Sequence, residues 1–209
     1  MRLFPHTLGF QERYFKTLQA LPSWEEAMLI VEAGNHKASA PIMHQALEDE
    51  RAKTLAAVRL FFELKPPVRR LIKEAARLPN LQAVYFNGPR NWDHFEFLSA
   101  YPGLKRFHAE AVHSFHGQKP VRHIGLEYLG LEPDRWGIKT VRSVSDCVFP
   151  NLKFLRLDIR TVGTRDAPEA VEIISSFFSR TTFPNLEHLG LIGCRFGNRL
   201  LKSLAETLD

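Results

Sequence analysis

Four stretches of this sequence decide its fold: PNLQAVYF at residues 79–86, PGLKRFHA at 102–109, PNLKFLRL at 150–157 and PNLEHLGL at 184–191. Each follows the pattern Pro-x-Leu-x-x-apolar-x-apolar. The last two apolar positions are separated by one residue, which is the period of a β-strand with one buried face. Each copy therefore predicts a short strand.

The segments between these copies have the features of helices. Asn91 can cap WDHFEFLSAY, Asp166 can cap APEAVEIISSFFSR, and Asn198 can cap RLLKSLAETL. A strand-helix unit of this size cannot bury its apolar strand face alone and must stack on its neighbours. The alternation therefore predicts parallel strands joined by right-handed crossovers, with the helices on the outside.

A fifth copy is expected near residues 120–132, where two registers compete. One uses Val121, Ile124 and Leu126 and keeps a proline just ahead of the motif. The other uses Leu126, Leu129 and Leu131 and gives more even spacing. The two registers send opposite side chains outward, because a shift of one residue turns a strand over. The sequence leaves both open, and residues 132–148 are interpreted as an insertion or an irregular repeat.

The N-terminal part, residues 1–66, is predicted to be a helical region or cap. Ser23 and Glu26 form a capping box ahead of a helix at about 24–33. A stretch rich in Ala, Leu, Glu, Arg and Lys then runs from residue 41 to 64 and predicts one or two helices, which end at the Pro66-Pro67 pair. Residues 68–78 carry apolar side chains at helical spacing. The repeat region is placed at 67–209.

The repeated motif resembles the leucine-rich-repeat family, whose consensus is L-x-x-L-x-L-x-x-N/C-x-L. The last copy matches best, with Leu186, Leu189, Leu191, Cys194 and Phe196. Other copies have Pro89, Val112 and Arg160 at the N/C position, and the copies are 23 residues apart at Leu81–Leu104 but 34 apart at Leu152–Leu186. The resemblance implies an α/β fold: a short solenoid of parallel strands and outer helices, preceded by the helical region.

In such a stack, the residues flanking the second and third apolar positions point into the open concave surface. They include Arg and aromatic side chains, the types enriched where protein interfaces make their strongest contacts. The alternative is that Arg-Glu and His-Glu neighbours simply neutralise one another on a solvated sheet. The predicted partner-binding residues are Tyr85, Asn87, Arg106, His108, Glu110, His123, Phe154, Arg156, Asp158 and His188.

Composition and charge restrict the classes of partner and the cellular location that we expect. The 28 basic and 23 acidic residues give a net charge of +5, which permits contact with nucleic acid or acidic proteins, but the charge is spread along the chain. A modest basic cluster lies on one helical face at Arg69, Arg70, Lys73 and Arg77, where a solvated face is the ordinary explanation. With two cysteines, no signal-like segment and no apolar run long enough to cross a bilayer, we expect a cytoplasmic protein without membrane contact.

The sequence contains no signal for catalysis or for a cofactor. Glycine-rich phosphate loops and the G-x-S-x-G elbow are absent. Four histidines crowd one region, but their spacing matches no zinc signature, so no metal site is predicted. They are His108, His113, His116 and His123. Cys147 is expected to pack as a small apolar group, and Cys194 to occupy the consensus position.

These observations predict a non-enzymatic protein-protein interaction module that binds its partner on the concave sheet face. Two alternatives remain open. One is a nucleic-acid-binding protein that uses the basic helical face and the Arg-bearing strands. The other is a structural adaptor that acts through the N-terminal helices.

Overall fold

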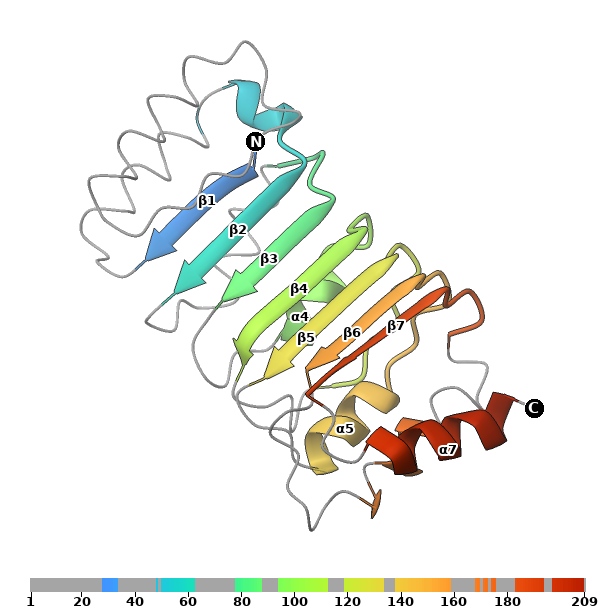
Figure 1. The fold of residues 1–209 in the computed structure, drawn as a ribbon. Coiled ribbons are helices and arrows are strands. Elements are labelled where there is room, and N and C mark those ends of the chain that lie inside the picture. Colours follow the sequence, from blue (N-terminus) through green and yellow to red (C-terminus); the bar gives the residue numbers. More distant parts are fainter. Residues whose placement is uncertain are drawn as a thin grey trace.

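The computed structural model describes residues 28–33, 48, 50–62, 78–87, 94–112, 119–133, 138–158, 168–169, 171–172, 174–175, 183–193 and 197–208. Within these ranges, seven strands form one parallel sheet, in which each strand lies beside the next strand of the chain (Figure 1). The fold is therefore α/β. The strands are β1 (Met28–Ala33), β2 (Ala57–Phe62), β3 (Ala83–Asn87), β4 (Arg106–Val112), β5 (Tyr128–Pro133), β6 (Phe154–Asp158) and β7 (His188–Ile192).

Helical segments connect some of these strands. A short 3-10 helix, η1 (Glu50–Thr54), precedes β2, and α4 (His94–Ala100) lies between β3 and β4. The connection from β5 to β6 contains α5 (Ile138–Ser145), and α7 (Gly197–Leu208) follows β7. Residues 168–169, 171–172 and 174–175 are also helical. These elements confirm the helices predicted after Asn91, Asp166 and Asn198. The first two predicted capping residues lie outside the described residues, and α7 begins at Gly197, so Asn198 lies within its first turn and does not precede it.

The Pro-x-Leu motif forms a β-turn ahead of each strand. In each of the four copies, the amide of the motif leucine donates to the carbonyl three residues earlier, for example from Leu81 to Leu78 (3.1 Å) and from Leu104 to Tyr101 (3.0 Å). Proline is then the second residue of the turn, where its fixed φ fits. The motif therefore fixes the point at which each strand starts.

Asparagine at the third turn position ties each turn to the preceding unit. The Asn80 side chain donates to the carbonyl of Lys53 (2.6 Å), Asn151 to Ile124 (2.8 Å), and Asn185 to Pro150 (2.9 Å). These bonds repeat along the same edge of the sheet. The copy at 102–109 has Gly103 at this position and lacks the bond because glycine has no side chain.

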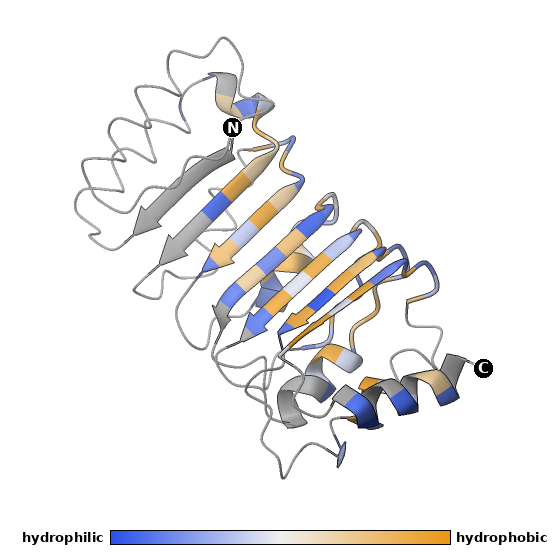
Figure 2. Cartoon of the chain, in the orientation of Figure 1, coloured by the Kyte–Doolittle hydropathy of each residue, from blue (hydrophilic) through white to orange (hydrophobic). Residues whose placement is uncertain are grey.

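Two apolar rows of the sheet form the core. One row runs through Val84, Phe107, Leu129 and Leu155 at matched register, and each of these is at most 1% exposed. The second row, two residues further along each strand, is equally buried. Figure 2 shows the resulting alternation of apolar and polar bands along the strands. The second row contains Phe86, Ala109, Leu131 and Leu157.

Helix α4 packs against these rows through aromatic rings. The buried His94 ring meets Phe86 edge-on, with centroids 4.9 Å apart, and Phe97 lies 6.3 Å from Phe107. Helix α4 therefore covers the apolar face behind the sheet (Figure 1), and the side chains between the two rows remain on the opposite face. No helix among the described residues is long and apolar enough to cross a membrane.

The helical prediction for the N-terminal part is wrong at residues 28–33 and 57–62, although residue 48 and η1 are helical. Residues 28–33 form β1 and residues 57–62 form β2. Strand β2 pairs with β3, so one sheet continues across the boundary placed at residue 66. Local helix propensity is weak and is overridden by pairing with neighbouring strands. The helix predicted at 68–78, with its basic cluster, lies outside the described residues except for Leu78.

The fifth copy takes the register through Leu126, Leu129 and Leu131, all 0% exposed. Leu129 and Leu131 pair with buried residues of both β4 and β6, which fixes the orientation of β5. Residues 132–148, interpreted as irregular, include α5 and a bridge between Arg122 and Val148.

Candidate binding face

The face of the sheet opposite α4 carries three polar rows, and we call it the open face. Strand pairing sets the rows, because matched residues of parallel neighbours lie side by side. The first row contains Ala83, Arg106, Tyr128, Phe154 and His188. The middle row contains Arg59, Tyr85, His108, Gly130, Arg156 and Gly190. The third includes Asn87, Glu110 and Glu132.

His108 lies at the centre of this face, yet its side chain is only 8% exposed. The rings of Tyr85 and Tyr128 flank it, with centroid distances of 6.1 and 6.2 Å. Its Nδ1 lies 3.2 Å from the Tyr128 hydroxyl. The imidazole also occupies the space above Gly130, where a β-carbon would lie 2.1 Å from Nδ1. Glycine at this position therefore permits the buried ring.

Glu110 accepts contacts on both carboxylate oxygens. Oε1 lies 3.4 Å from His108 Nε2, while Oε2 accepts from Asn87 at 3.2 Å and lies 3.5 Å from the Arg59 guanidinium. The hydrogen bond from His108 lowers the pKa of Glu110, and Arg59 acts in the same direction against the opposing effect of burial. Glu110 is therefore held as a carboxylate.

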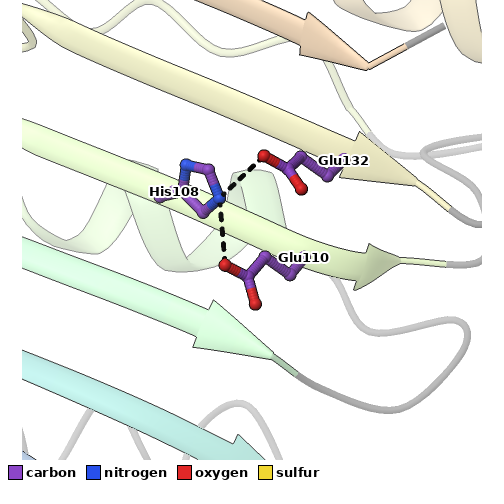
Figure 3. A group of neighbouring side chains, drawn as sticks. All are labelled: His108, Glu110 and Glu132. Atoms are coloured by element: carbon purple, nitrogen blue, oxygen red, sulfur yellow. Dashed lines mark ion pairs between the residues drawn. The ribbon is translucent and has the colours of Figure 1, made fainter. Parts of the chain in front are cut away.

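Glu132 completes the cluster from the neighbouring strand. Its Oε1 lies 3.5 Å from His108 Nε2 (Figure 3). The same oxygen lies 2.8 Å from the Arg156 guanidinium. Two carboxylates thus approach one imidazole nitrogen, and one arginine beside each glutamate offsets its charge. The ligand atoms of His108, Glu110 and Glu132 all lie within 4.8 Å of one another.

A second part of the open face is more accessible, and we call it the aromatic-arginine patch. Phe154 is 41% exposed, and its ring stacks on His188 with centroids 4.4 Å apart and planes 8° from parallel. Arg156 beside it is 46% exposed. Arg106 is exposed and has no ion pair within the described part of the chain. The patch consists of Arg106, Tyr128, Phe154, Arg156 and His188.

Most of the predicted site residues share this face, but two differ from expectation. His123 precedes β5 and is 3% exposed, with Nε2 2.8 Å from the Tyr101 carbonyl. Its assignment to the binding face was wrong, because it depended on the register that β5 does not adopt. Asp158 holds its predicted strand position but is only 4% exposed. Glu127, the other charged residue of the rejected register, pairs with Lys105 and Lys153 instead.

Three residues of the open face were missed from the sequence. Tyr128 and Glu132 point outward only in the second register of the fifth copy. The predicted site used the first register, which places His123 outward. Arg59 was missed because β2 was predicted to be helical. The alternation of Val58, Arg59 and Leu60 was the available signal for a strand.

Cys147 is fully buried, as predicted for a small apolar residue. Its sulfur accepts from the Val121 amide at 3.4 Å and donates to the Ser143 carbonyl at 3.3 Å. Burial raises the pKa of the thiol to about 12, so it does not ionise near neutral pH. Cys194, His113 and His116 lie outside the described residues.

Comparison with known proteins supports the fold alone. No family model and no curated protein matches this sequence. The fold is similar to that in the crystal structure of a Bacteroides fragilis protein, a structural-genomics target, with a TM-score of 0.64 and 16% sequence identity. The match covers 85% of this chain and 55% of that protein, so this chain spans little more than half of its length. The similarity agrees with an α/β architecture built on a parallel sheet.

Proposed function

We propose that this chain is a short leucine-rich-repeat-type solenoid that acts without catalysis by binding an acidic segment of a protein partner on its open face. The aromatic-arginine patch carries the proposal. Phe154 and His188 form an exposed stacked pair, and Arg106 is a solvent-facing cation without an ion pair in the described residues. Aromatic and arginine side chains together are typical of the strongest contacts in protein interfaces.

The charges on the open face indicate which kind of partner would bind there. The glutamates of the open face are part-buried and already matched by Arg59, Arg156 and His108. Arg106 is not matched within the described residues, so the accessible part of the face is cationic. Carboxylates of a partner would complement it, and an aromatic or aliphatic side chain would cover Phe154.

The two other hypotheses have less support. Among the described residues, support for nucleic-acid binding comes from the strand arginines, and Arg156 of these is already paired with Glu132. An adaptor acting through N-terminal helices is less well supported, because residues 28–33 and 57–62 of that region form strands.

The test is selection of peptides from a displayed random library against the full chain. The face variant is Arg106→Ala with Phe154→Ala. The matched control is Arg199→Ala with Ile124→Ala, which also removes one exposed arginine and one exposed large apolar side chain, but away from the open face.

We expect the selected peptides to be rich in Asp and Glu with an aromatic residue. They should bind the control like the wild type, and the face variant at least about tenfold more weakly. Equal binding to both variants, or enrichment of basic peptides, would contradict the proposal. A single-stranded oligonucleotide that binds the wild type more tightly than any selected peptide would favour the nucleic-acid alternative instead.

A further inference from the structure

The contacts of His108 with Glu110 and Glu132 are unusual for hydrogen bonds. Nε2 lies 3.4 Å from one carboxylate oxygen and 3.5 Å from the other (Figure 3). Charge-assisted N–H···O bonds are normally about 2.7–2.9 Å long. A single Nε2 proton between two oxygens at these distances satisfies neither carboxylate well.

The same distances suit ligands around a metal ion. With metal-ligand bonds of about 2.0–2.2 Å, the ligands of a tetrahedral ion lie about 3.4 Å apart. The two nitrogen-oxygen separations match this value, and all three ligand atoms lie within 4.8 Å of one another. A small rotation of one glutamate side chain would therefore bring all three to bonding distance of one ion.

The histidine is held in a position that suits a ligand. Its side chain is 92% buried, and the missing side chain of Gly130 leaves room for the ring. Without an ion, Nε2 carries the proton that is shared with Glu110. When an ion binds, the Tyr128 hydroxyl, 3.2 Å from Nδ1, can accept the Nδ1 proton, which frees the Nε2 lone pair for the metal. Histidines that bind metals commonly donate their second nitrogen to such a partner.

Each glutamate has an outer partner as well. Asn87 and Arg59 contact the Oε2 atom of Glu110 and leave Oε1 toward His108. Arg156 lies 2.8 Å from Oε1 of Glu132, the oxygen that also faces His108, and therefore shares this oxygen with the site. Hydrogen bonds of this kind orient ligating carboxylates. The two arginines also weaken the attraction for a cation, so an exchangeable ion is expected rather than one required for folding.

We propose that His108, Glu110 and Glu132 form a binding site for a divalent transition-metal ion of the zinc class. One imidazole nitrogen and two carboxylate oxygens provide three ligands, and the open face supplies space for water or another ligand. This site cannot be recognised in the sequence, because its three ligands come from two strands that only the fold brings together, whereas the crowded histidines are neighbours in the chain. The site does not depend on the proposed partner.

The test is titration of the chelator-treated full chain with Zn²⁺ by calorimetry and with Co²⁺ by absorption spectroscopy, at about pH 7.5, where a free imidazole is mostly neutral. The variants are His108→Ala and Glu132→Gln. Glu127→Gln is the matched control, because it makes the same change at a part-buried glutamate that pairs with Lys105 and Lys153. Circular dichroism checks that each variant folds, and Glu110→Gln replaces any that does not.

We expect a site in the wild type and the control that both ligand variants weaken at least about tenfold. The Co²⁺ spectrum should have d–d bands without a thiolate charge-transfer band. The proposal is overturned if the wild type binds neither ion or if the ligand variants bind as tightly as the control. A cobalt-thiolate band would also overturn it, because it would place the ion at a cysteine.

Discussion

Substitution of Gly130 by alanine tests whether the open face is built around the His108 ring. A β-carbon there would lie 2.1 Å from Nδ1 and 2.9 Å from both Cε1 and the Tyr128 hydroxyl. The ring is confined between Tyr85 and Tyr128, so it must shift by about 1 Å or more to reach ordinary contact distance. Overpacking of this kind typically costs about 1–3 kcal/mol.

Two further effects change the stability of Gly130→Ala, and the first of them is stabilising. Replacing glycine by alanine reduces the entropy of the unfolded chain and stabilises a protein by about 0.4–1 kcal/mol where the backbone permits it. Loss of the Nδ1 contact with Tyr128 costs about 1 kcal/mol. The net expectation for Gly130→Ala is a destabilisation of about 1–3 kcal/mol.

Substitutions at two other glycines serve as comparisons for Gly130→Ala. At Gly190, in the same row of the open face, the closest atom to a new β-carbon is 3.8 Å away, so Gly190→Ala should be neutral or stabilising. At Gly125 a β-carbon would lie 2.3 Å from the backbone oxygen of Pro102, which cannot rotate away, so Gly125→Ala should be the most destabilising of the three.

Urea unfolding followed by circular dichroism gives the free energy of unfolding for each variant. The expected order of stability is Gly190→Ala, then Gly130→Ala, then Gly125→Ala. Equal stability of the Gly130 and Gly190 variants would refute the reasoning, because the two differ chiefly in the presence of the His108 ring.

Three further predictions concern buried groups and the turns. Burial lowers the pKa of His123, whose Nε2 donates to the Tyr101 carbonyl while Nδ1 is buried without a hydrogen-bond partner. The unfolded chain then binds the proton more tightly, so stability is retained above the ordinary pKa of 6.5 and falls as the pH drops below it. His123→Gln retains an N–H donor but does not titrate, so its urea midpoint should fall less than that of the wild type between roughly pH 7 and pH 5; parallel curves would contradict this. Cys147, with a pKa of about 12 and no exposure, should resist iodoacetamide at neutral pH until the protein unfolds, and mass spectrometry that finds it labelled in the native protein would disprove its burial. Asn151→Ala removes the bond to the Ile124 carbonyl and should lower the free energy of unfolding by about 0.5–1.5 kcal/mol, whereas an unchanged value would indicate that water replaces the amide.

The repeated motif was sufficient to predict four strands. The copies beginning at residues 79, 102, 150 and 184 lead into β3, β4, β6 and β7. The apolar positions of the first three form the buried rows, and those of β7 are half-buried. This worked because strict alternation has no helical interpretation. The first two strands were missed because they lie in segments rich in helix-forming residues and no Pro-x-Leu turn marks their start. The alternation of Val58, Arg59 and Leu60 is too short to outweigh the surrounding composition, and pairing with neighbouring strands decides the outcome.

The open face was predictable only where the register was certain. Tyr85, Arg106, Phe154 and Arg156 lie where the motif placed them. Glu132 was missed, because the fifth copy allowed two registers and only its pairing with β4 and β6 selects one. A shift of one residue exchanges every outward side chain. Because the register of the fifth copy was uncertain, all the outward side chains of that strand were missing from the predicted face, and not Glu132 alone.

The central cluster depends on a residue with no side chain at all. His108 lies close to Glu110 and Glu132 only if its ring occupies the space above Gly130 on the adjacent strand. In the sequence, Gly130 is one glycine among twelve, and nothing local separates it from Gly190, where a β-carbon would make only ordinary contacts with Arg156. The difference arises from the residue beside each glycine on the preceding strand: His108 in one case and Arg156 in the other. A rigid ring next to glycine fills the gap, whereas a long arginine extends past it. Polar motifs alone therefore cannot locate such a site, and the pairs of residues that face each other across the sheet have to be known first.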